Sequence, residues 1–266
     1  FQPARLIIVA AALVAAIFLR SAMGWLPDLN DREEYLINAD AVEVTQAPHF
    51  IPSDFVAQAF HKADLPERIS LLDDSATQQI HDALERHPWV ERVLSVSKQS
   101  PGRIVAELEY RTPVAMVEVP RGVYPVDANG TLLPPENFTV SDAKQYPLIT
   151  GVVSTPQGPQ GTSWGDPVVV GAATLATTLT DDWKEFQLEK IHCGKDRIDD
   201  EPTYQLISQG GSRIMWGYAP GETRPGEPDA RQKLQRLKKY LNHFGDFEKP
   251  DGPYEINIRH WQEISR

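Results

Sequence analysis

A glycine-flanked serine comes nearest to a catalytic pattern in this sequence. Ser163 is the third residue of GTSWG at residues 161–165, which has the spacing of the nucleophile elbow of serine hydrolases. That elbow needs a buried strand directly before the serine and a helix directly after it. Residues 154–160 are rich in proline, glycine and polar residues and predict a loop, and Asp166-Pro167 delays the next helix. The pattern therefore does not favour a hydrolase.

The other reactive residue types form no known catalytic or metal-binding constellation. SDAK at residues 141–144 has the S-x-x-K spacing of penicillin-binding enzymes, but neither K-T-G nor S-D-N follows. The histidines lack the H-E-x-x-H pattern and close ligand spacing. The one cysteine, Cys193, lies beside His192 and is interpreted as a buried structural residue. We predict no catalytic residue, no metal site and no cofactor.

The composition is that of a globular chain with an acidic balance. Of 266 residues, 41% are hydrophobic and 24% are charged, which fits one or two folded domains. A formal charge of -11 disfavours nucleic acid as a partner, because phosphate binding needs an excess of basic residues. The densest basic run is interpreted as the solvated face of an amphipathic helix and comprises Arg231, Lys233, Arg236, Lys238 and Lys239.

An unbroken apolar run near the beginning of the sequence predicts a membrane segment. LIIVAAALVAAIFL fills residues 6–19, and extension to Leu26 gives a helix of about 31 Å, enough for a hydrocarbon core of about 30 Å. A cleaved signal peptide is the alternative, with small residues at Ala22 and Gly24, although Arg20 fits poorly before a cleavage site. We expect an uncleaved transmembrane helix within residues 1–27, with the bulk of the chain outside the cytoplasm.

The residues after this segment predict a small domain of alternating element types. Strands are expected at 35–44, 90–96 and 103–111, and helices are expected to follow Ser53 and Ser75. The order is therefore strand, helix, helix, strand, strand. Two helices on one face of a three-stranded sheet would satisfy this order.

From Pro113 onward, short strands and turn signals predominate. Helices are predicted at 166–180, where Asp166 precedes Pro167 at the first helical position, and at about 230–244. A final strand is expected at 254–258. The whole sequence thus predicts an α+β protein, whose second part is a mixed α/β domain with a curved, mostly antiparallel sheet.

Several of these stretches carry a resemblance to a known family. Residues 88–119 read PWVERVLSVSKQSPGRIVAELEYRTPVAMVEV, and YPVDANGTLLP and the terminal YEINIRHW follow further along. The sequence resembles the FtsQ family of bacterial cell-division proteins, called DivIB in some lineages. The motif residues to which the resemblance gives a structural role are Pro88, Trp89, Val90, Pro113, Asp127, Gly130, Trp216 and Gly217.

The resemblance implies an organisation and a function. It implies a transmembrane helix in 1–27, a linker and POTRA domain in 28–112, and an FtsQ-type β domain in 113–266. The function implied is that of a non-enzymatic scaffold of the division machinery, in the cell inner membrane as a single-pass protein with its carboxyl-terminal bulk in the periplasm. A POTRA-bearing, chaperone-like component of protein export or outer-membrane assembly is the alternative.

The partners implied are division proteins similar to FtsB and FtsL, which would add a strand at the terminal edge. Other division components would bind through the POTRA domain and the span, and the span would contact the lipid bilayer. Relative to the family pattern, Asn257 replaces an aspartate and residues 261–263 replace a glycine-bearing continuation. The partner-binding residues predicted are Tyr254, Ile256, Ile258, Arg259 and Trp261, with Arg236 and Lys239 on the neighbouring helix.

These predictions include a mutational expectation. Charge reversal of Arg259, or proline at Ile258, is expected to abolish partner capture while leaving the fold intact.

Overall fold

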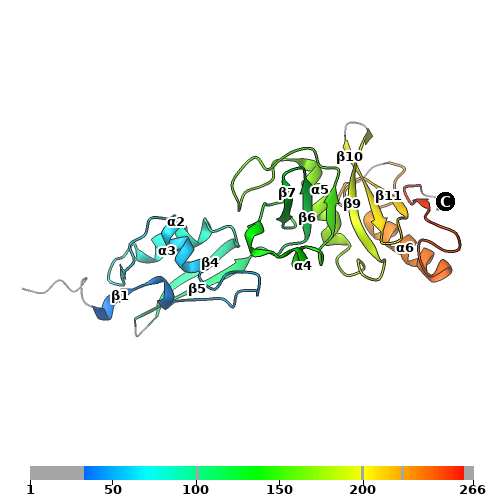
Figure 1. The fold of residues 1–266 in the computed structure, drawn as a ribbon. Coiled ribbons are helices and arrows are strands. Elements are labelled where there is room, and N and C mark those ends of the chain that lie inside the picture. Colours follow the sequence, from blue (N-terminus) through cyan, green and yellow to red (C-terminus); the bar gives the residue numbers. More distant parts are fainter. Residues whose placement is uncertain (1–32, 100–101, 199–200, 223–224, 261–266) are drawn as a thin grey trace, which may run out of the picture.

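The structure is a computed structural model that describes residues 33–99, 102–198, 201–222 and 225–260. Its elements gather around two hydrophobic cores that follow one another along an elongated molecule (Figure 1). The first core lies under a three-stranded sheet and the second under a seven-stranded sheet. The predicted α+β class is confirmed.

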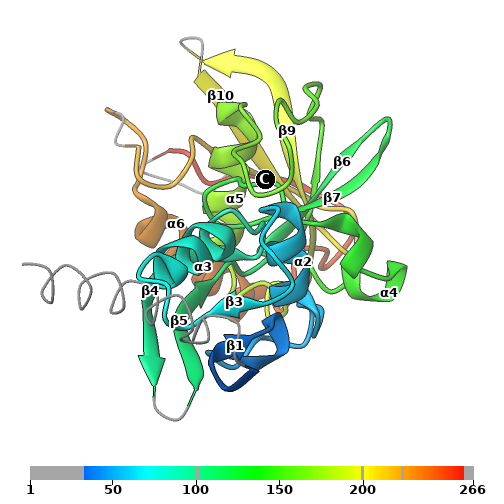
Figure 2. The ribbon, with the colours of Figure 1, turned by 90° about the vertical axis from the view of Figure 1, so that its left-hand side faces the viewer.

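The first core has the predicted element order. Its three-stranded sheet and two helices follow each other as β2 (Val42–Val44), α2 (Phe55–Lys62), α3 (Ala76–Glu85), β4 (Val90–Gln99) and β5 (Arg103–Tyr110). The central strand β5 pairs in parallel with β2 and antiparallel with β4. Figure 2 shows α2 and α3 together over one face of this sheet. Their apolar sides supply the core with residues such as Phe60, Ile80 and Leu84.

The single strand predicted at 35–44 is wrong. The chain instead forms η2 (Glu33–Tyr35), β1 (Leu36–Ile37), a turn of 3₁₀ helix, η3 (Ala39–Ala41), and only then β2. The break starts at Asn38, whose carbonyl accepts a hydrogen bond from the Ala41 N–H (3.1 Å). Asparagine and aspartate favour such turns, which interrupt an otherwise alternating sequence. The separated β1 pairs antiparallel with β3 (Ile69–Ser70).

His87 is buried in the first core without a full set of hydrogen bonds. It is 3% exposed, and its Nδ1 accepts a hydrogen bond from the Trp89 N–H (3.4 Å). Its Nε2 has no partner among the described residues, and its ring meets Phe55 edge to face at 5.6 Å. Burial, reinforced by the positive charge of Lys62 and opposed by Asp54, lowers the pKa of His87 to about 4. The imidazole is therefore neutral in the folded chain at neutral pH.

Acid is expected to destabilise the fold through His87. An unfolded histidine titrates near pH 6.5, so its contribution is fully present above that pH and declines as the pH falls toward about 4. The loss over this window is expected to reach up to about 3 kcal/mol. Urea denaturation at pH 7.5 and 4.5 measures it, and His87→Leu should reduce the difference between the two pH values. An unchanged difference in that variant would assign the acid sensitivity to other groups.

The second core lies under a mixed sheet with the strand order β12-β11-β10-β9-β8-β6-β7. The strands are β6 (Ala115–Val119), β7 (Gly122–Val126), β8 (Leu148–Thr150), β9 (Leu188–Ile198), β10 (Glu201–Ser208), β11 (Arg213–Gly217) and β12 (Glu255–Asn257). The pairs β6–β7, β9–β10 and β10–β11 are antiparallel. The pairs β6–β8, β8–β9 and β11–β12 are parallel. The prediction of a mostly antiparallel sheet is therefore corrected to an evenly mixed one.

Two of the three parallel pairs, β8–β9 and β11–β12, are connected by helical crossovers. α5 (Pro167–Thr178) joins β8 to β9, and α6 (Ala230–Phe244) joins β11 to β12. Both begin at capped ends, because the Asp166 side chain accepts the Val168 N–H and Asp229 forms a capping box with Gln232. Both predicted helices are confirmed, one ending two residues earlier than predicted.

Residues that follow β7 in the sequence contribute to the first core. Leu133 and Phe138 follow β7 in the sequence but pack in the first core. The Trp89 Nε1–H donates to Asn137 Oδ1 (3.1 Å), at the end of the short helix η4 (Pro135–Asn137), which precedes α4 (Val140–Ala143). Side chains from beyond β7 therefore complete the first core.

Within the described ranges, no helix is both long enough and apolar enough to cross a bilayer. The predicted membrane segment, residues 6–26, lies outside the described residues.

Candidate partner-binding edge

The two outer strands of the large sheet are protected to different degrees. On β7, Pro125 lacks an N–H, and its carbonyl accepts the Leu133 N–H (2.9 Å). Val126 also forms a bridge with Leu132, so the chain covers this end of β7 itself. At the opposite end, β12 pairs only with β11 among the described strands. Such an exposed edge can accept another strand.

The hydrogen bonds to β11 identify which backbone groups of β12 face outward. The Arg213 N–H donates to the Tyr254 carbonyl (2.8 Å), and the Ile258 N–H donates to the Met215 carbonyl (3.5 Å). Backbone groups alternate in direction along a strand, so the N–H and C=O of Glu255 and Asn257 point away from β11. No hydrogen bond to these four outward groups is found within the described part of the chain.

Side chains of the protein itself limit the open stretch. Asn257 Oδ1 accepts hydrogen bonds from the Arg259 N–H and Nε, both at 3.1 Å. The next outward N–H is therefore already satisfied. Arg236 Nη1 on α6 donates to the carbonyls of Ile258 (3.2 Å) and His260. These contacts fix the segment that follows β12 and leave two residues of backbone available for pairing.

The predicted side chains divide between the core and the surface. Ile256 and Ile258 are 0% exposed and belong to the second core, so they cannot contact a partner without unfolding. Tyr254 is half-buried against the same core. Arg236 and Arg259 are also half-buried.

Lys239 is exposed on α6, and Trp261 lies outside the described residues. The expectation for proline at Ile258 is corrected, because the Ile258 N–H donates to Met215 and its side chain fills the core. Glu255 and Asn257, whose backbone groups face outward, were not among the predicted positions. The same alternation that places Ile256 and Ile258 on one face of the strand assigns Glu255 and Asn257 to the opposite face.

A buried ion pair lies beside β11, the strand that pairs with β12. Lys233, predicted as a solvated helix residue, is 3% exposed, pairs with Glu227, and has its Nζ 5.0 Å from the Trp216 ring. Glu227 Oε1 also accepts the Tyr218 N–H (3.1 Å). Gly217 has φ of +93°, and a Cβ there would overlap Glu227. Burial lowers the pKa of Lys233, while Glu227 acts in the opposite direction.

The remaining family motif residues lie far from β12 in the sheet order and make structural contacts. Asp127 accepts the N–H groups of Asn129 and Thr131 and the Arg111 guanidinium (2.8 Å). Gly130 has φ of +70° and lies against Val170. These contacts fix the turn after β7.

The first motif is buried where the two cores meet. Pro88 lies against Gly161, Trp89 and Val90 are each 1% exposed, and Pro113 is buried.

The residues that resembled catalytic groups have ordinary structural contacts. Ser163 Oγ accepts the Gly165 N–H (3.3 Å), and α5 begins only at Pro167, so the geometry of a nucleophile elbow is missing. Burial raises the pKa of the Cys193 thiol to about 12, and the neighbouring His192 contacts Thr150 (3.1 Å). No group of three metal-ligating side chains is found within the described ranges.

These features define a two-core α+β protein in which, among the described residues, β12 forms an open edge of the seven-stranded sheet. No family model matches the sequence. The chain is 29% identical over 174 residues to the cell division protein FtsQ of Myxococcus fulvus, an alignment that covers 62% of this chain and 53% of the relative. The match thus spans about half the length of that relative. The similarity supports the membership of the FtsQ/DivIB family that the sequence motifs indicated.

Proposed function

We propose that this chain is a non-enzymatic scaffold of the bacterial cell-division machinery that binds a partner by strand addition at β12. The observation that carries the proposal is the pair of outward backbone positions, Glu255 and Asn257, which have no hydrogen-bond partner within the described residues. The protected state of β7 restricts strand addition to one end of the sheet. The family relation provides the cell-division context.

The short open stretch indicates how the partner binds. Two residues offer up to four backbone hydrogen bonds, each with a net contribution of about 1 kcal/mol. That total does not offset the loss of freedom on association, which is about 4 kcal/mol or more. The partner must therefore also contact side chains, and Glu255 and Lys239 are exposed nearby. Tethering of both proteins to one membrane would raise their effective concentration.

The proposal includes the domain organisation and the membrane position. A single membrane span lies within residues 1–27, a linker and a POTRA domain occupy residues 28–112, and the partner-binding β domain occupies residues 113–266, outside the cytoplasm. The order strand, helix, helix, strand, strand around the first core supports the POTRA assignment. The partners are division membrane proteins similar to FtsB and FtsL, and other division components bind through the POTRA domain and the span.

Site-specific photo-crosslinking in dividing cells tests this function. A photoreactive amino acid at Glu255 is expected to crosslink to a small membrane protein of the division machinery, identified by mass spectrometry. The same amino acid at Val123, on the protected edge strand β7 and 42% exposed, is the matched control and should give no such product. Equal products from both positions would contradict strand addition at β12. Crosslinks to unfolded outer-membrane proteins would instead support the chaperone-like alternative.

A further inference from the structure

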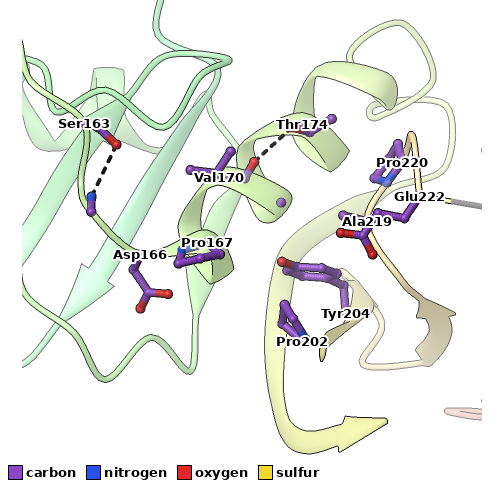
Figure 3. A pocket seen from close by; sticks show the side chains of 12 residues that line it. Ser163, Asp166, Pro167, Val170, Thr174, Pro202, Tyr204, Ala219, Pro220 and Glu222 are labelled. Carbon is purple, nitrogen blue, oxygen red and sulfur yellow. Dashed lines mark hydrogen bonds between the residues drawn. The ribbon is translucent and has the colours of Figure 1, made fainter. Parts of the chain in front are cut away.

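Cavities lie on both faces of the seven-stranded sheet. The cavity beside α5, of about 520 Å³, is walled by Tyr204, which is only 1% exposed and leaves a ligand little to contact (Figure 3). The second cavity, of about 470 Å³, lies over β9, β10 and the start of β11. Side chains alternate between the two faces of a strand, so Lys190, Gln205 and Arg213 point into this second cavity and away from the core. Its volume falls within the range of preformed ligand pockets.

The second cavity has a positive lining. Lys190 and Arg213 lie in its wall, and none of the described residues that line it is Asp or Glu. In the whole chain, by contrast, 37 acidic residues outnumber 26 Lys and Arg residues. The exposed Arg213 side chain forms no ion pair or hydrogen bond within the described ranges. Lys190 pairs with Glu189 (3.3 Å), but both side chains are exposed, and such a pair contributes little and can be exchanged.

The strand registers place these groups around one point. Ile207 on β10 is the Cα partner both of Lys190 on β9 and of Arg213 on β11. Neighbouring strands are about 4.8 Å apart, so a carboxylate above Ile207 has a cation on either side, at a separation that long side chains span. Gln205 lies two residues away on the same face of β10, and its amide has no hydrogen-bond partner among the described residues. This amide can donate to the same carboxylate.

The cavity is continuous with the open edge. Arg213 is the Cα partner of Glu255 on β12, and Glu255 neither lines the cavity nor forms an ion pair with Arg213. A strand added to β12 would be separated from β10 by three strand spacings, or about 14 Å. About four or five extended residues cover that distance. A segment that leaves the added strand can therefore reach Ile207 across the exposed face of the sheet.

We propose that this cavity binds a glutamate or aspartate side chain of the partner, from the segment that flanks its strand on β12. This contact rests on the proposed function, because pairing at β12 brings the segment to this face. The carboxylate lies above Ile207, accepts hydrogen bonds from the Arg213 guanidinium and the Gln205 amide, and faces the Lys190 ammonium. It sets the register of the partner strand, which two backbone positions alone define weakly.

Photo-crosslinking in dividing cells tests where the segment lies. A small diazirine-bearing amino acid in place of Ile207 is expected to crosslink to the same protein as the photoreactive residue at Glu255. Mass spectrometry should map the two attachment points within about six residues of each other, with Asp or Glu at or beside the first. A product at Glu255 without one at Ile207 would overturn this contact and leave strand addition intact. Products at neither position would overturn both.

Binding measurements test the role of charge. Surface plasmon resonance compares the full chain in detergent micelles with its K190Q/R213Q variant, against the protein that is crosslinked at Glu255. The variant is expected to raise Kd about tenfold and to reduce the salt dependence of binding. Arg213→Lys should recover part of the loss. The thermal midpoint should not change, because the Arg213 side chain has no partner in the folded chain among the described residues.

The double variant K184Q/R231Q is the matched control. It removes the same charge from two exposed positions outside the cavity, and Kd should change less than twofold. Equal losses in the two double variants would assign the effect to general attraction and overturn the site. Replacing the mapped acidic residue of the partner with its amide should cause the same tenfold loss, with no further loss in K190Q/R213Q. Additive losses would show that this carboxylate binds elsewhere.

Discussion

Replacing Glu255 with proline is expected to abolish capture of the partner strand while the chain remains folded. The outward N–H of this residue is one of the four backbone groups proposed to pair with the partner, and proline removes it. A partner carbonyl left without a donor, together with the lost bond, weakens binding by about 3 kcal/mol, or roughly a hundredfold in Kd. Co-purification from solubilised membranes and surface plasmon resonance with the isolated partner measure the effect.

Glu255→Thr provides the matched control. Threonine changes the same exposed side chain but keeps the backbone N–H, so binding should fall by much less than in the proline variant. Ile258→Pro should instead lower the thermal midpoint, because that N–H donates to Met215 within the sheet. Equal loss of binding in the threonine and proline variants would mean that the side chain, not the backbone, makes the contact.

Replacing Glu227 with leucine is expected to have the largest effect on stability. It leaves the ammonium of Lys233, 3% exposed, without its partner carboxylate. An unpaired buried charge costs about 3 to 5 kcal/mol, which is comparable with much of the stability of a domain. It also removes the acceptor of the Tyr218 N–H. Urea denaturation monitored by tryptophan fluorescence should report the loss, since Trp216 lies beside Lys233.

The double variant E227L/K233M identifies the cause of this loss. If the unpaired charge dominates, the second substitution should recover most of the stability, because an apolar pair of similar size is tolerated at such sites. Lys238→Met is the control: Lys238 pairs with Asp182, but its side chain is 48% exposed. Loss of that pair should change the stability by less than about 1 kcal/mol. A double variant no more stable than E227L would point to lost packing instead.

The helices of this protein were predictable because their signals are local. Asp166 with Pro167 and the apolar spacing of 230–244 marked α5 and α6 closely. The first helix begins two residues after the expected Ser53, and its cap position is Asp54, because a cap depends on how the preceding turn folds.

The sheet was less predictable because pairing depends on distant residues. The long central strand β9 was missed because its buried residues do not alternate throughout. A register shift between Leu188 and Lys190 places the next buried residue, Ile191, three positions after Leu188, and only Ile191 and Cys193 keep the spacing of two. Nor does any local signal show that β8 lies between β6 and β9, which makes two parallel pairs. The balance of parallel and antiparallel pairs follows from these crossovers.

The candidate edge was partly predictable. The alternation of Ile256 and Ile258 located a terminal strand, but it also means that these side chains face the core. Only the pairing of Arg213 with Tyr254 and of Ile258 with Met215 shows which backbone groups remain available.

The packing of Leu133 and Phe138 in the first core affects where the protein can be divided into separate fragments. A truncation after residue 112 would remove two apolar side chains from the core of the amino-terminal fragment. The same side chains would be exposed on the carboxyl-terminal fragment. Both fragments would then expose a hydrophobic patch that is buried in the intact chain. Binding measured with either fragment alone would therefore include non-specific association of this patch with other hydrophobic surfaces.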